Sequence, residues 1–183
     1  MRRAAAAVLL LLVGCSGQGA PDRAAPTTTA PGPVEGASLA LASPPLREGA
    51  WPVEHTCDGE NTAPPLEWSG VPEGTAELVL LLQDPDAPGG TFTHWVVFGI
   101  PPEDGSTAAG QSPAGGLEGS NSFGETGYGG PCPPEGQEHR YIFSLFAMAE
   151  PTGLQQAASL DQVDQAVSVR PLAGGQLAAS YGR

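Results

Sequence analysis

The sequence predicts an all-β fold, a β-sandwich, and three observations favour it. Short apolar runs separated by turn residues fill most of the chain after residue 35, and only one segment has helical spacing. Glycine and proline, 26 and 20 of 183 residues, are spread between these runs, where they would form turns. Hydrophobic residues make up 40% of the chain, enough for a core. We expect antiparallel sheets with Greek-key connections and one or two short peripheral helices.

The first strands are expected to be short. ASLALAS, residues 37–43, alternates in polarity and ends before two prolines, which cannot donate to a strand ladder. PPLEWSG, residues 64–70, places Leu66 and Trp68 on one face of a strand. Both segments therefore read as strands with one buried face.

Three longer runs are nearly continuous in apolar residues and rich in β-branched and aromatic types. They cover residues 76–83, 93–100 and 138–150. Such runs are typical of central strands that are covered on both faces of a sheet.

The pattern changes near the end of the chain. Leu160, Val163 and Val167 recur at helical spacing, and Ser159 with Gln162 forms a capping box, so one short helix is predicted between residues 159 and 169. GGQLAASYGR, residues 174–183, is expected to form a last strand at a sheet edge.

The N-terminal segment has the features of an export signal. Two arginines precede ten apolar residues, too few to span a bilayer, so residues 1–14 are interpreted as a signal peptide. LVGC resembles the lipobox of bacterial lipoproteins, which would make Cys15 the acylated (palmitate-bearing) residue; the alternative is an ordinary signal peptide with a chance cysteine. Residues 15–34, rich in Pro, Ala and Thr, are expected to be a disordered tether before a domain over 35–183. The predicted location is the extracytoplasmic face of the cell membrane.

Charge excludes several functions. The formal net charge is −13 and the chain contains no lysine. Without a basic surface to neutralise phosphates, nucleic-acid binding is excluded, as is chemistry that needs a lysine.

Polar residues gather at the ends of the predicted central strands. Asp84 and Asp86 follow one strand between prolines, and His94 and His139 stand at the starts of two others. Histidines can donate to an anion, and a carboxylate such as Asp84 favours their charged, two-donor form. The glycine-rich loop 127–130 could add backbone N–H groups as a nest.

Other interpretations stay open at this point. Asp84 or Asp86 could meet an ammonium group, or the DPDAP motif could be only a turn beside histidines of the core. A zinc site from the three histidines and Asp58 is disfavoured, because their spacing matches no compact ligand motif.

Catalysis is also disfavoured. GSNSFG does not fit a nucleophile elbow, although Cys132 beside His139 could in principle act as a nucleophile. We expect no metal, no cofactor and no enzyme activity.

Four segments occur in order: TCDGENTAPPLEW, DPDAPGGTFTHWVVFGIPP, GYGGPCPPEGQEHRY and HRYIFSLFAM. From about Leu39 to Arg183 the chain thereby resembles the phosphatidylethanolamine-binding protein family, in its bacterial Raf-kinase-inhibitor-like branch. The resemblance implies an antiparallel β-sandwich with a small pocket that holds a phosphate-like anion or a phospholipid headgroup. It assigns that pocket to Asp84, Pro88, His94, Gly130, Cys132, His139 and Tyr141.

The same resemblance brings the loops of Cys57 and Cys132 to one end of the sandwich. With Cys15 taken by lipid, these two cysteines could form a disulfide or remain free thiols. We expect a membrane-anchored binding protein, and regulation of an unknown protein partner is a further role open to it. The alternatives are a protease- or kinase-inhibitor-like protein and, less favoured, a hydrolase.

Overall fold

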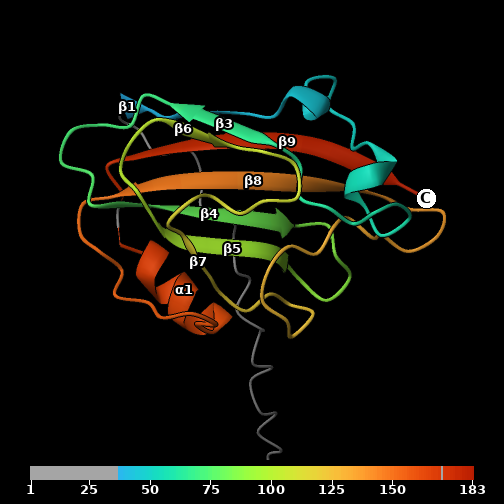
Figure 1. The fold of residues 1–183 in the computed structure, drawn as a ribbon. Helices are drawn as coiled ribbons and strands as arrows, with labels where there is room; N and C mark the ends of the chain where they lie inside the picture. The colour runs from blue at the N-terminus through green and yellow to red at the C-terminus, as the bar shows by residue number, and fades with distance from the viewer. Residues whose placement is uncertain (1–36, 170) are drawn as a thin grey trace, which may run out of the picture.

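The computed structural model describes residues 37–169 and 171–183, and it contains two β-sheets and one α-helix (Figure 1). The larger sheet has the strand order β1 (Ala37–Ser38), β9 (Ala173–Gly182), β8 (Glu138–Met148), β4 (Glu77–Asp84), β5 (Phe92–Ile100) and β7 (Leu117–Glu118). The smaller sheet has the order β2 (Ala40–Ala42), β3 (Leu66–Ser69) and β6 (Gly105–Thr107). Every pairing is antiparallel except that of β1 with β9. The mainly antiparallel all-β class expected from the sequence is confirmed.

Strand β4 shows why the longest apolar runs lie at the centre. All eight of its residues are buried. Leu78, Leu80 and Leu82 belong to the core between the two sheets. Val79 and Leu81 point to the opposite face and join a second core beneath the helix. Both faces of the larger sheet are therefore covered, as the unbroken hydrophobic pattern predicted.

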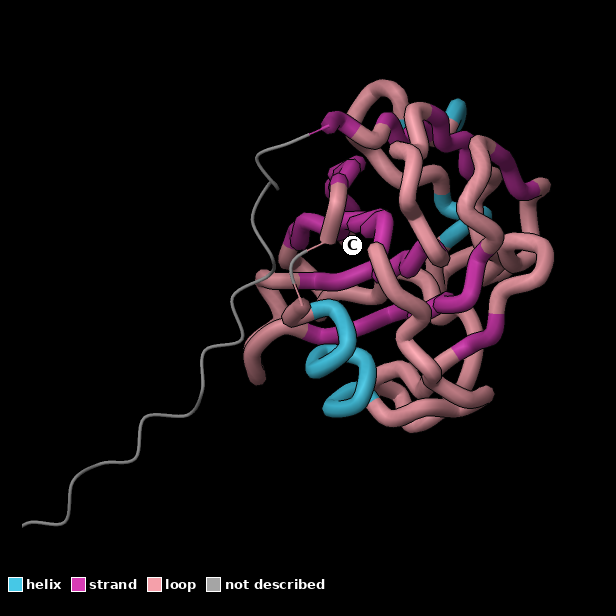
Figure 2. Tube along the Cα trace, turned by 90° about the vertical axis from the view of Figure 1, so that its left-hand side faces the viewer, coloured by secondary structure: helices cyan, strands magenta, loops and turns pink. Residues whose placement is uncertain are grey.

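Helix α1 (Leu160–Val167) covers that second face (Figure 2). Its capping box is confirmed: the Ser159 hydroxyl accepts from the Gln162 N–H, and the Gln162 side chain accepts from the Ser159 N–H. Val163 and Val167 are the buried residues of the helix and pack against strands β4, β5 and β8. Two short 3-10 turns, η1 (Pro44–Leu46) and η2 (Val53–His55), complete the helical structure of the described residues.

The segment 37–43 is not the single strand that its alternation predicted. Its first two residues pair with β9, whereas Ala40–Ala42 pair with β3 in the other sheet. The chain changes sheet at Leu39, whose carbonyl oxygen would lie 2.1 Å from a Cβ placed on Gly175. A glycine at position 175 permits this close crossing of the two backbones.

One further expectation is corrected, and two short strands lie in a segment for which no strand was predicted. Strand β9 is not the sheet edge, because β1 pairs with its first residues, Ala173 and Gly174. The loop between Pro102 and Gly127 contains the short strands β6 and β7, whose few residues are too polar and glycine-rich to give a strand pattern.

Within residues 37–169 and 171–183, no helix is long and apolar enough to cross a bilayer. The predicted signal peptide, Cys15 and the tether lie outside the described residues.

The sheet brings four strand ends together. Because β4 pairs antiparallel with both β5 and β8, the last residue of β4 lies near the first residues of its two neighbours. Strand β9 ends at the same side, where Tyr181 pairs with His139 (the end marked C in Figure 1). The residues proposed for binding are positioned at this end.

Candidate functional site

The site is built around a buried pair formed by Asp84 and His139. Asp84 is the last residue of β4 and His139 the second of β8. The His139 Nδ1 lies 2.8 Å from the Asp84 Oδ2, and both side chains are only 5% exposed. The Asp84 Oδ1 accepts a second hydrogen bond, from the Asp86 N–H at 2.8 Å. One oxygen of the Asp84 carboxylate therefore holds the imidazole ring of His139, and the other holds the turn that follows β4.

The other ring nitrogen of His139 faces a residue that the sequence did not single out. Its Nε2 lies 3.2 Å from the Gln137 Oε1. A side-chain amide can accept from the charged ring or, when turned over, donate to the neutral ring. Gln137 is exposed, so it covers the outer edge of a buried histidine and could be displaced by a ligand.

His94 differs from His139 in its surroundings. Its Nδ1 donates to the Gly129 carbonyl oxygen at 2.8 Å. Because a carbonyl oxygen can only accept, the proton is on Nδ1 and the Nε2 of the neutral ring is an acceptor. Burial lowers the pKa of His94, although the Gly129 contact and the Asp84 charge act in the opposite direction. At neutral pH this histidine is therefore uncharged.

Tyr141 lies beside His94 with its ring centroid 5.2 Å away. The residue is 1% exposed, and its hydroxyl makes no hydrogen bond within the described structure. Burial raises the pKa of the Tyr141 hydroxyl, and the nearby Asp84 carboxylate raises it further. The Cys132 backbone also lies close to the hydroxyl and acts in the opposite direction, but neither it nor the Asp84 carboxylate meets the geometry of a hydrogen bond to Tyr141. A buried hydroxyl without a partner is costly, so a ligand atom that reached it would be stabilising.

The glycine-rich loop does not present the N–H nest that was expected. The Gly129 N–H donates to the His94 carbonyl oxygen, and the Gly130 N–H donates to the Asn61 Oδ1 at 2.7 Å. A Cβ on Gly130 would lie 2.5 Å from the His55 carbonyl oxygen, so this position has no room for a side chain. The N–H donors of Gly129 and Gly130 are therefore already used, and these two glycines form a tightly packed wall.

Asp86 is engaged by an arginine that the sequence interpretation overlooked. Arg140 donates from Nε at 2.9 Å and from Nη2 at 2.7 Å to the two carboxylate oxygens. The hydrogen bonds from Arg140 lower the pKa of Asp86 to about 2. The negative charge of Asp86 is thus already neutralised, which disfavours the alternative that it holds an ammonium group.

The structure joins Cys57 and Cys132 in a disulfide. The bond links the loop after η2 to the glycine-rich loop, where the Cys57 N–H also donates to the Pro131 carbonyl oxygen. While this disulfide is intact, Cys132 has no thiolate to act as a nucleophile, which disfavours the Cys132 hydrolase alternative.

Two remaining expectations concern Pro88 and a metal site. Pro88 is exposed on the turn after β4, and its role as a wall of the site stays a prediction. Each of the three histidines has a different partner for its Nδ1: the Thr62 carbonyl oxygen for His55, the Gly129 carbonyl oxygen for His94 and Asp84 for His139. No group of three potential metal ligands occurs among the described residues.

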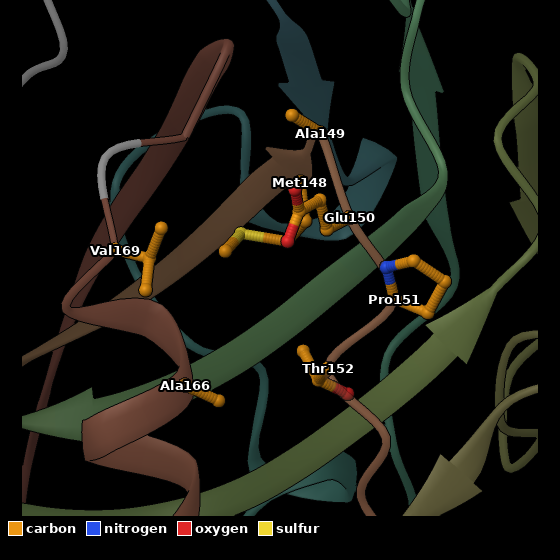
Figure 3. A pocket seen from close by; sticks show the side chains of 7 residues that line it. All are labelled: Met148, Ala149, Glu150, Pro151, Thr152, Ala166 and Val169. Carbon is orange, nitrogen blue, oxygen red and sulfur yellow. The ribbon is translucent and has the colours of Figure 1, made fainter.

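Three cavities of the described residues lie away from this site. The one in Figure 3, of about 300 Å³, lies at the opposite end of the larger sheet, where the Met148 side chain extends toward Val169. The other two lie beside η1 and beside β6. At the other end of the sheet, the Asp84 and His139 side chains are buried and the Gln137 amide contacts the His139 Nε2, so a ligand would have to move Gln137 to reach that nitrogen.

The residues missed by sequence reasoning are Asn61, Gln137, Arg140 and Arg183. The scarcity of cations could have drawn attention to two of them. Arg47, Arg140 and Arg183 are the arginines of the described residues, and the last two flank the site. No sequence signal distinguishes Gln137 or Asn61, because both depend on where loops return.

Comparisons with known proteins agree with this arrangement. A family model described as "Phosphatidylethanolamine-binding protein" matches residues 43–182. The chain is 44% identical over 180 residues to "Putative lipoprotein LppC" of Mycobacterium tuberculosis H37Rv, covering 93% of this chain and 88% of that one. It is also 44% identical over 140 residues to a "UPF0098 protein" of Methanothermobacter thermautotrophicus, covering 74% and 92% of the two chains.

A solved structure has the same fold. The crystal structure of E. coli YbcL, described as a new member of the mammalian PEBP family, matches with a TM-score of 0.74 and 30% sequence identity. The match covers 80% of this chain and 99% of YbcL.

Proposed function

Because the chain belongs to the phosphatidylethanolamine-binding protein family, we propose that it binds a phosphate-like anion or a phospholipid headgroup at the Asp84–His139 end of its larger sheet. It does so as a lipid-anchored protein on the extracytoplasmic face of the cell membrane. The similarity to a protein named as a lipoprotein supports the anchor, together with the LVGC segment that ends at Cys15.

The observation that carries the binding proposal is the Tyr141 hydroxyl. It is buried next to His94 and Asp84 and has no hydrogen-bond partner within the described residues. An oxygen of a phosphate group can accept from this hydroxyl and from the His139 Nε2 once Gln137 has moved. These two hydrogen bonds would satisfy the Tyr141 hydroxyl and replace the contact between His139 and Gln137.

The charges of the site favour a singly charged ligand. His94 is neutral and the Arg140 charge is paired with Asp86, so the site has little unpaired positive charge near the Asp84 carboxylate. A phosphate monoanion keeps one O–H, which can donate to the His94 Nε2 or to Asp84. A dianion lacks that donor and is repelled more strongly by Asp84.

We propose a binding protein and not an enzyme. Cys132 is held in a disulfide, and the Asp84–His139 pair bonds the Gln137 side-chain amide and the Asp86 backbone N–H, neither of which is a nucleophile. A histidine that is fixed by a carboxylate can serve binding by presenting a donor in a fixed direction.

The test is calorimetry on the full chain with Cys15→Ser, purified in an uncharged maltoside detergent that carries no phosphate. Inorganic phosphate and phosphoethanolamine should both bind, and Tyr141→Phe should weaken binding about three- to tenfold through the loss of one hydrogen bond. Tyr181→Phe is the matched control, because the Tyr181 hydroxyl is already satisfied by Asp58 at 2.7 Å. Equal affinities of wild type and Tyr141→Phe would contradict the proposal.

A further inference from the structure

The Cys57–Cys132 disulfide lies at the surface beneath a guanidinium group. Both cysteine residues are exposed, so the disulfide lies at the surface, where a dissolved thiol can approach it. The Arg183 Nη1 lies 3.2 Å from the Cys132 Sγ and 3.6 Å from the Cys57 Sγ. A disulfide that serves only as a structural link needs neither this exposure nor a cation in contact with both sulfur atoms.

Arg183 is held in this position by the residues around it. Its Nη2 pairs with the Asp58 Oδ1 at 3.2 Å, and the Tyr181 hydroxyl donates to the other oxygen of that carboxylate. The Arg183 carbonyl oxygen also accepts from the Gly136 N–H at 2.6 Å. Asp58 offsets part of the charge, whereas the guanidinium contacts both sulfur atoms directly.

We propose that this disulfide is a site of thiol–disulfide exchange with a dithiol reductant, and that Arg183 stabilises the thiolate that leaves. One thiolate of the dithiol attacks the Cys57 Sγ, the Cys57–Cys132 bond breaks, and Cys132 leaves as a thiolate beside Arg183. The second thiolate of the reductant then attacks the reductant sulfur that is bonded to Cys57 in the mixed disulfide, and Cys57 leaves as a thiolate. The products are the cyclic oxidised dithiol and the reduced Cys57 and Cys132.

The charge of Arg183 acts on both the rate and the equilibrium. A nearby cation lowers the free energy of a thiolate, which makes Cys132 a better leaving group. It also stabilises the reduced protein relative to the disulfide form, so that a weaker reductant is sufficient. The same cation attracts the incoming anionic thiolate.

Reduction would release part of the wall of the Asp84–His139 site. The two loops would then be held together by the Gly130–Asn61 and Cys57–Pro131 hydrogen bonds. The Cys132 backbone lies beside the Tyr141 hydroxyl, so the freed segment is the one that encloses this group. The exchange proposal itself stands independently of what the site binds.

The experiment uses the full chain with Cys15→Ser in detergent, which leaves only the two cysteines of the disulfide. The chain is incubated at pH 7 with mixtures of reduced and oxidised dithiothreitol, quenched by alkylation and analysed by mass spectrometry. Arg183→Gln should require about three- to tenfold more reduced dithiothreitol for half reduction and should react correspondingly more slowly. Arg140→Gln is the control, because Arg140 contacts Asp86 and not the disulfide, and it should match the parent within about twofold.

The reduction rate also reports which state of the protein reacts. It should rise in proportion to the dithiothreitol concentration and should not change in a urea concentration well below the unfolding transition. A rate that levels off at the unfolding rate would show that only the unfolded chain reacts, and it would overturn the proposal. Identical midpoints and rates for Arg183→Gln and the parent chain would overturn the role of Arg183.

Discussion

The Asp84 carboxylate lies 2.8 Å from the His139 Nδ1, although 55 residues separate the two in sequence. The contact arises because β4 ends where its antiparallel neighbour β8 begins. Both side chains are removed from water, so the Asp84 Oδ2 and the His139 Nδ1 depend on each other for this hydrogen bond.

The first prediction concerns this pair. Asp84→Ala should lower the free energy of unfolding by roughly 3–5 kcal/mol, because it leaves a histidine N–H buried without its acceptor and frees the Asp86 N–H. His139→Ala should also destabilise the fold, and the double variant should lose less than the sum of the two. Urea unfolding of the four proteins measures this coupling, and strictly additive losses would contradict it.

The second prediction is a pH dependence of stability due to His94. Burial places the pKa of His94 below its ordinary value of 6.5, so the unfolded chain binds a proton more readily than the folded one. His94 therefore favours the folded state fully above about pH 6.5, and this contribution is lost as the pH falls. The loss should approach but not exceed about 1.4 kcal/mol per pH unit.

His94→Gln isolates this effect, because glutamine keeps an N–H donor for Gly129 but does not titrate. Urea midpoints at pH 7.5, 6.5 and 5.5 should fall more steeply for wild type than for the variant. The same slope in both proteins would assign the pH dependence to other groups.

The third prediction concerns the disulfide as a cross-link. Its two cysteines are 75 residues apart, and a closed loop of that length restricts the unfolded chain. Replacing both cysteines by serine should cost around 4 kcal/mol of unfolding free energy in the loop-entropy description. Before any reduction, thiol labelling of the denatured wild type should find neither Cys57 nor Cys132 free. Two labelled thiols in exported protein would contradict the bond.

The fold could be predicted well where the hydrophobic pattern is long. The runs containing Leu78–Leu82 and the capping box at Ser159 are local signals, and both appear in the structure as expected. The change of sheet at Leu39 was missed because it depends on Gly175, which is distant in sequence and comes close only after folding.

The candidate site was also predicted only in part, because some of its contacts follow from the strand pattern and others depend on the paths of loops. Asp84 and His139 meet because strand ends meet in an antiparallel sheet, which the pattern of runs implies. The use of the Gly130 N–H by Asn61, and the Gln137 amide over His139, depend on loop paths that no periodicity encodes.

The fourth prediction concerns the anchor. Cys15→Ser should abolish lipid attachment and leave a precursor that keeps its N-terminal segment, because the serine hydroxyl cannot form the thioether of a lipoprotein. Metabolic labelling with a radioactive fatty acid, followed by mass spectrometry of the N-terminus, checks both outcomes. Cys57→Ser is the matched control and should still carry lipid. A Cys15→Ser protein that matures and incorporates lipid like wild type would contradict the prediction.

The last prediction concerns how protons control anion binding. His139→Asn keeps a side-chain N–H for Asp84 but removes the second ring nitrogen, so it should weaken phosphoethanolamine binding by about ten- to a hundredfold while the fold persists. Affinity for wild type should fall as the pH rises from 5.5 to 7.5, because a phosphate ester loses its second proton near pH 6 and then meets Asp84 as a dianion. A sulfate monoester remains a monoanion over this range, so its affinity should fall less. Calorimetry at three pH values with both ligands measures these differences. Phosphate affinity that rises with pH, or that is unchanged in His139→Asn, would show that the ligand does not contact the Asp84–His139 pair.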